Sequence, residues 1–195
     1  MHSILRSNLF FVKEQVGIFK AANNFDIFDP ASGQQILQCR EPRLGFFTKL
    51  FRFTDYKRMT PFHVEVTTPQ GERVLSIKRG FSLLRSKVEV CDEHERVVGS
   101  FRQRLLSIGG RFDVLDAQGQ LSCSLQGKWT SWDFRFMRGE RELGHVSKQW
   151  AGLGKELFTS ADNYMLAIKP DVGPEEAVRI LIVAAVLCID MVLKE

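Results

Sequence analysis

The sequence lacks the residue patterns that mark metal centres, redox sites and hydrolases. It has no C-x-x-C pair, no H-E-x-x-H and no G-x-S-x-G, and a P-loop ending at Gly154-Lys155 is incomplete because Gln149 stands where its first glycine belongs. The four histidines are scattered, and we interpret His63 and His145 as structural residues. We therefore expect no conventional enzyme, no catalytic residue and no obligatory cofactor.

Long apolar runs are also scarce near the start of the chain. The longest, Leu9–Val12, ends at Lys13 and is too short for a secretory signal. No myristoylation or prenylation motif is present. The cysteines are far apart and lie among apolar residues, which is typical of free, buried thiols in a reducing compartment. They are Cys39, Cys91, Cys123 and Cys188. These features predict a cytoplasmic protein.

Charge is present in both signs but is distributed unevenly. The chain has 27 Lys and Arg against 23 Asp and Glu, a net charge of +4. Residues 40–111 contain 15 basic and 8 acidic side chains, a net of +7, and the remainder carries 12 and 15, a net of −3. A basic middle segment indicates an anionic partner, with phospholipid headgroups favoured over nucleic acid. The alternative is that these residues are solvated outer faces of strands.

Five segments of alternating apolar residues are each interrupted by a turn rich in Asp, Gly, Pro or Glu, which is the pattern of β-hairpins. Further strands are expected at residues 9–16 and 164–168. About twelve strands predict an antiparallel sheet that closes into a barrel, too wide for strand side chains alone to fill. The predicted hairpins span residues 25–39, 62–77, 88–101, 112–125 and 133–146.

The C-terminal segment predicts a helix over about 174–193. It begins with Pro174 and two acids, and its ten residues Ile180–Ile189 are apolar on every face. A membrane span needs about 20 apolar residues, whereas this run is bracketed by Arg179 and Asp190. A helix buried inside the barrel is therefore favoured, and a tail-anchored span is the alternative.

The chain resembles the phospholipid scramblase family. Residues His145–Tyr164 are similar to that family's segment G-x-I-S-K-x-W-x-G-x-x-x-E-x-F-T-D-A-D-N-F, and Leu187–Glu195 resembles its closing L-I-D-x-M-F-F-E. Cys39–Glu41 and Thr60–Phe62 also match. The resemblance implies a Tubby C-terminal-like (LURP-one-like) fold: a mainly β, twelve-stranded antiparallel barrel around a central hydrophobic C-terminal helix.

The chain departs from the family at two places. Residues Phe81–Ser86 occupy the position of the family's palmitoylated cysteine cluster but contain no cysteine. The family's proposed calcium segment corresponds to residues 160–171, where Asp162, Asn163 and Asp171 are the candidate ligands. Because only two of these are carboxylates and calcium takes 6–8 oxygen ligands, we expect weak calcium binding at most. The alternative is that Asp162 and Asn163 form a turn before a strand.

Residues 43–58 interleave phenylalanine with basic side chains. Aromatic rings beside cations suit the interface of a membrane, with the charges on phosphate groups. The alternative is a loop or short helix that covers one mouth of the barrel. The residues predicted to contact lipid headgroups are Arg43, Lys49, Arg52, Lys57 and Arg58.

Together these features predict one domain, residues 1–195, that binds anionic phospholipid at the inner face of the plasma membrane. Phospholipid scrambling follows from the resemblance alone. The alternative function is a soluble Tubby-like barrel that acts as a protein-interaction or regulatory module. We expect a monomer with no nucleic-acid partner.

Overall fold

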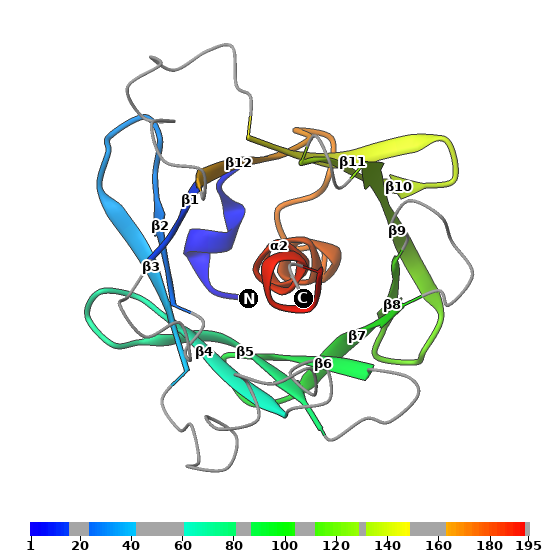
Figure 1. Cartoon of the computed structure of the whole chain (residues 1–195), viewed down its shortest axis with the longest axis horizontal. Helices are drawn as coiled ribbons and strands as arrows, with labels where there is room; N and C mark the ends of the chain where they lie inside the picture. Colours follow the sequence, from blue (N-terminus) through cyan, green and yellow to red (C-terminus); the bar gives the residue numbers. More distant parts are fainter. Residues whose placement is uncertain are drawn as a thin grey trace.

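The computed structural model describes residues 1–15, 24–41, 61–80, 87–103, 112–128, 132–148 and 163–193, without the side chains of residues 103, 128 and 189–193. Twelve strands in these ranges form a closed antiparallel barrel, in which β1 pairs with both β2 and β12 (Figure 1). The strands are β1 Leu9–Glu14, β2 Phe25–Phe28, β3 Gln35–Arg40, β4 Phe62–Thr67, β5 Arg73–Arg79, β6 Lys87–Asp92, β7 Val97–Gln103, β8 Phe112–Asp116, β9 Leu121–Lys128, β10 Asp133–Arg138, β11 Arg141–Ser147 and β12 Asn163–Ile168. The predicted fold class is confirmed.

The alternation in the sequence explains which side chains enter the barrel. On β4, Phe62, Val64 and Val66 are buried, whereas the intervening His63 and Glu65 are only partly buried. Successive side chains of a strand point to opposite faces, so one face of each strand lines the interior. The five predicted hairpins are all present. The strand predicted at 9–16 ends at Glu14.

The two ends of the barrel are built differently. The five hairpin turns, together with the link from β12 to the C-terminal helix, lie at one end, which we call the turn end. They follow β2, β4, β6, β8 and β10. Strand direction alternates around the barrel, so the other six connections join strand ends at the opposite end, which we call the connection end.

The C-terminal α-helix, α2 (Val178–Leu193), lies along the barrel axis (Figure 1). Every side chain from Ile180 to Cys188 is at most 5% exposed, which confirms the prediction of a buried helix. Sixteen residues give a length of about 24 Å. Within the described part of the chain, no helix is long and apolar enough to cross a membrane.

The helix begins later than predicted. Pro174 lies in a turn, and the backbone N–H of Gly173 donates to the Glu176 carboxylate at 2.7 Å. The backbone carbonyl oxygen of Glu176 accepts a hydrogen bond from the backbone N–H of Arg179 at 2.9 Å. These hydrogen bonds hold residues 173–177 in a turn, so the acids that suggested a first helical turn belong to the link before it.

The barrel wall makes room for the helix at Gly99 on β7. A methyl group at this position would lie 2.2 Å from the carbonyl oxygen of Leu115 and 2.8 Å from Cδ2 of Leu181. Non-bonded atoms cannot approach so closely, and the close-packed protein interior leaves no free space into which the neighbours could move. Gly99 therefore fixes how near α2 can approach β7 and β8.

Arg179, at the first turn of α2, is the largest fully buried side chain among the described residues and is 1% exposed. It donates to the carbonyl oxygens of Leu5 at 2.9 Å and Val172 at 3.0 Å, and to Oδ1 of Asn8 at 2.9 Å. Two further bonds reach the carbonyls of Arg6 and Ser7. Burial lowers the pKa of Arg179, which Glu176 partly offsets. The guanidinium thus ties the start of α2 to the N-terminal 3-10 helix η1 (Ser3–Arg6).

We predict that Arg179→Met lowers the free energy of unfolding by at least about 3 kcal/mol, because it removes five hydrogen bonds and leaves buried carbonyls unpaired. Arg179→Lys keeps the charge but not the planar set of donors, so an intermediate loss is expected. Urea unfolding followed by tryptophan fluorescence measures both. Arg135→Met, on the outer wall, is the matched control. A loss for Arg179→Met no larger than the control's would contradict this assignment.

We also predict that Ellman's reagent does not react with the thiols of the native protein. All four cysteines are free and buried. Burial raises the pKa of Cys123 to about 12 and raises the pKa of Cys39, Cys91 and Cys188 as well. At about pH 8 such thiols hold little reactive thiolate. Four equivalents should therefore appear only in denaturant. Rapid labelling of Cys188 in the folded protein would show that α2 leaves the barrel.

Candidate functional site

The residues predicted to contact lipid headgroups lie outside the described residues. The segment that contains them joins β3, which ends at Arg40, to β4, which begins at Phe62. Both of those strand termini are at the connection end. The headgroup assignment of Arg43, Lys49, Arg52, Lys57 and Arg58 therefore stays a prediction.

The predicted calcium ligands are separated by a strand. Asp162 is outside the described residues, Asn163 is the first residue of β12, and Asp171 follows the last. Six strand residues extend roughly 17 Å, so Asn163 and Asp171 lie near opposite ends of the barrel. The Asp171 carboxylate accepts from Arg141 at 3.0 Å. No group of three metal-binding side chains occurs among the described residues.

Two residues of the segment that resembles the scramblase family, Lys148 and Tyr164, join an aromatic cluster near the connection end. The Lys148 ammonium lies 4.2 Å from the ring centroid of Trp132, and Trp132 stacks on Tyr164 with centroids 6.1 Å apart. Close by, His145 Nε2 lies 2.8 Å from Oδ1 of Asp133 on the neighbouring strand. Lys148 and Tyr164 are distant in sequence, so β11 and β12 bring the two halves of the motif together.

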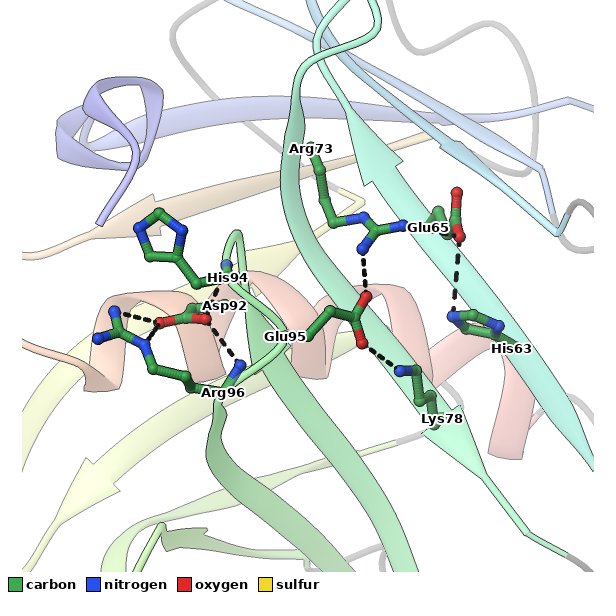
Figure 2. A network of polar contacts seen from close by, with 8 residues as sticks. All are labelled: His63, Glu65, Arg73, Lys78, Asp92, His94, Glu95 and Arg96. Carbon is green, nitrogen blue, oxygen red and sulfur yellow. Dashed lines mark hydrogen bonds and ion pairs between the residues drawn. The ribbon is translucent and has the colours of Figure 1, made fainter.

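The densest set of charges that the structure describes lies on the outer wall (Figure 2). His63 and Glu65 come from β4, Arg73 and Lys78 from β5, and Glu95 from the turn between β6 and β7. We call these five side chains the β4–β5 cluster. Their side chains are 29–38% exposed, although Nε2 of His63 is itself buried.

Glu95 bridges the two cations of the cluster. One carboxylate oxygen accepts from Arg73 Nη1 and the other from Lys78 Nζ. Arg73 Nη2 also donates to Glu65 Oε1 at 3.2 Å, and His63 Nε2 lies 4.0 Å from the same oxygen. His63 pairs directly with Lys78 across the β4–β5 ladder. The cluster therefore alternates positive and negative groups across two strands and a turn.

The pKa directions follow from these contacts. The hydrogen bond from Lys78, together with the charge of Arg73, lowers the pKa of Glu95 against the opposing effect of burial. The same bond raises the pKa of Lys78. Burial and the charge of Lys78 lower the pKa of His63. At neutral pH Glu95 is ionised, Lys78 is protonated, and His63 is a neutral imidazole. The cluster can bind an ion through charge and hydrogen bonds.

Asp92 shapes the turn that presents Glu95. One of its carboxylate oxygens accepts from the backbone N–H groups of His94 and Arg96 at 2.9 Å, and the other accepts from Arg96 Nε, also at 2.9 Å (Figure 2). Burial opposes ionisation of Asp92, but the hydrogen bonds from Arg96 and His94 outweigh it and lower the pKa. This turn is held without any contribution from the Glu95 side chain.

Glu95 occupies a backbone position where two related turns use glycine. The turns 68–72, 92–96 and 116–120 share two hydrogen bonds, from the first residue to the fifth and from the fourth to the first. The fourth residue has a φ of 91° at Gly71, 78° at Gly119 and 61° at Glu95. A residue with a Cβ loses roughly 1–2 kcal/mol in this left-handed region.

Sequence reasoning did not find the β4–β5 cluster. Aligning the three turns by their first residue would have placed Glu95 between two glycines, which was the available signal. The partners of Glu95 lie on another hairpin, and no local pattern links them to it. His63, interpreted as structural, is part of this cluster.

Comparisons with known proteins agree with the resemblance seen in the sequence. A model of the Scramblase family matches residues 9–195. A phospholipid scramblase family protein of Schizosaccharomyces pombe is 27% identical over 115 residues, which cover 54% of this chain and 30% of that protein. The match thus spans less than a third of that relative. An X-ray structure of a protein from Arabidopsis thaliana aligns over 94% of this chain and 91% of its own, with a TM-score of 0.53 and 14% identity; this shows likeness of fold.

We predict that Glu95→Gln weakens the fold in a pH-dependent way. Because the pKa of Glu95 is lowered in the folded state, its ion pairs stabilise the protein above the unfolded pKa and are lost as the pH falls through the folded value. The variant should unfold about 0.2–1 kcal/mol more easily at neutral pH, a range suited to exposed ion pairs. The two proteins should converge once the pH falls below the lowered pKa of Glu95 in the folded state.

Chemical denaturation across this pH range measures the difference. Glu140→Gln removes an exposed carboxylate from the turn between β10 and β11 and serves as the charge-matched control. A difference between wild type and Glu95→Gln that stays constant as the pH falls would show that Glu95 makes no ionic contribution.

Proposed function

The chain belongs to the scramblase family, and from that premise we propose that it binds anionic phospholipid at a membrane surface. The binding surface is the connection end of the barrel, with Arg43, Lys49, Arg52, Lys57 and Arg58 on the headgroup phosphates. The location we propose is the cytoplasmic face of the plasma membrane. The curated relative is longer than the matched region, so only membrane-surface binding is carried over from the family.

The separation of charge between the two barrel ends carries this proposal. The six connections at the connection end, residues 16–23, 42–60, 81–86, 104–111, 129–131 and 149–162, contain ten basic and three acidic residues, a net of +7. The whole chain is only +4, so all other residues together carry −3. A positive surplus of this size on one side attracts an anionic bilayer and orients the barrel toward it.

The turn end has no comparable surplus, because its bases are neutralised in pairs. Arg6 lies 2.8 Å from Glu175, and Arg96 lies 2.7 Å from Asp92. Three more bases follow the same pattern. These pairs are Arg138 with Glu176 at 3.4 Å, Arg141 with Asp171 at 3.0 Å, and Lys169 with Glu142 at 3.0 Å.

The expected binding free energies suit reversible attachment of the protein to a membrane. A basic residue near an anionic surface contributes about 1 kcal/mol, and its effect decays within a Debye length. Phenylalanines of residues 43–58 would add apolar contact at the depth of the headgroups. With α2 inside the barrel, the bases and rings of the connection end carry the attachment.

We predict that replacing Arg43, Lys49, Arg52, Lys57 and Arg58 by glutamine abolishes co-sedimentation with phosphatidylcholine vesicles containing phosphatidylserine. Wild-type binding should be strong at low salt and should disappear by about 0.5 M NaCl, where screening is nearly complete. Binding to pure phosphatidylcholine vesicles should be weak throughout.

The matched control neutralises five bases at the turn end, which changes the net charge by the same amount. That variant should bind as wild type does. Equal binding to neutral and anionic vesicles, or equal losses in the two variants, would contradict the proposal and favour the interaction-module alternative. The control positions are Arg6, Arg96, Arg138, Arg141 and Lys169.

A further inference from the structure

We propose that Arg73, Lys78 and His63 form a binding site for a phosphate monoester on the outer wall of the barrel. In this structure the Glu95 carboxylate occupies the site, and it must swing away for the ligand to bind. The site is separate from the connection-end surface of the proposed function and does not depend on it.

The contacts of Glu95 show what the site accepts. Its two oxygens are each held by a different cation, Arg73 through one guanidinium nitrogen and Lys78 through its ammonium. A phosphate monoester has the same negative oxygens, with one more acceptor and a larger charge. Guanidinium groups match phosphate geometry, and ammonium groups supply a point charge.

His63 provides the third donor. Its Nε2 is buried while Glu95 occupies the site and makes no hydrogen bond to any residue that the structure describes, and the nearest acidic oxygen is that of Glu65 at 4.0 Å. The imidazole stands beside Lys78 in the β4–β5 ladder. A third phosphate oxygen between them would satisfy a nitrogen that Glu95 does not reach.

The backbone of Glu95 indicates that its side chain is retained for a purpose. The two related turns hold glycine at this position, with the same positive φ. Asp92 alone ties down the turn through backbone hydrogen bonds, so the turn persists when the Glu95 side chain moves. Strained residues of this kind are concentrated at switching and ligand-binding positions.

The charge count favours an anion once Glu95 leaves. With Glu95 in place, Arg73 and Lys78 are balanced by Glu95 and Glu65. Without it, the site keeps two cations against Glu65, which pairs with Arg73 at 3.2 Å and not with Lys78. Lys78 then has no carboxylate within ion-pair distance among the described residues. The internal carboxylate thus acts as a competitor that sets the affinity for an incoming phosphate.

The test measures binding of inorganic phosphate and of glycerol 3-phosphate to the full chain by isothermal titration calorimetry at low salt. Glu95→Gly should bind both at least about tenfold more tightly than wild type, because the competitor is gone. Adding Arg73→Gln and Lys78→Gln to that variant should return the affinity to wild type or below. Glycine should be tolerated, as it is at positions 71 and 119.

Two further variants keep the result interpretable. Glu140→Gly removes one acid from another turn and should change the affinity less than about twofold. Glu95→Gln keeps the strained backbone and removes only the charge. It should therefore show most of the gain in phosphate affinity, even if the glycine variant is less stable. No gain in either Glu95 variant, or a gain that survives loss of Arg73 and Lys78, overturns the proposal.

Vesicles distinguish the source of the phosphate. The probe is phosphatidylcholine with one part in five of phosphatidic acid, added to proteins in which the five bases of residues 43–58 are already neutralised. If Glu95→Gly restores sedimentation there, the ligand is a lipid headgroup; if only glycerol 3-phosphate binding improves, it is a soluble ester. Either result supports the site. Failure of the wild-type protein to bind anionic vesicles, with phosphate binding intact, would count against the connection-end surface alone.

Discussion

The central constraint on this molecule is that a twelve-stranded barrel is too wide for its own side chains to fill. Apolar side chains from the strands line the inner face, but a closed sheet of this size leaves an axial space. Helix α2 occupies it, and its side chains from Val178 to Cys188 are buried on every side because strands surround the helix. An all-round apolar helix would be unstable in water, and an unfilled barrel would have a void. Each element therefore requires the other.

That mutual requirement explains two residues that otherwise look out of place. Glycine stands at position 99, within β7, because the carbonyl oxygen of Leu115 and the side chain of Leu181 come too close for any side chain. Arg179 lies inside an apolar interior because the helix must begin beneath η1, where backbone carbonyls need donors. A guanidinium can serve several carbonyls at once. The buried guanidinium therefore joins the start of α2 to the N-terminal segment of the chain.

Enclosing the helix also divides the outer surface into regions with different electrostatics. The basic side chains of the turn end are paired with acids. The sequence of the six connections, in contrast, contains the excess of basic over acidic residues. Between them, the β4–β5 cluster is balanced only because Glu95 adopts a backbone conformation that glycine adopts in neighbouring turns. The two proposals therefore assign different regions of the barrel to different tasks: one surface for attraction to a bilayer, and a separate site for a single phosphate group.

The sequence by itself determined the strands, the hairpins and the apolar helix, because these depend on periodicity and on turn residues that act over a few positions. It placed Pro174 in the helix by the same local rules, and the tertiary structure moved it into a turn because Glu176 bonds to Gly173 instead. Only the tertiary structure decided the partners of Arg179 and Glu95. Arg179 bonds to the opposite end of the chain, and Glu95 bonds to side chains on another hairpin. Contacts between distant residues follow from strand register and barrel closure, and no local pattern encodes them.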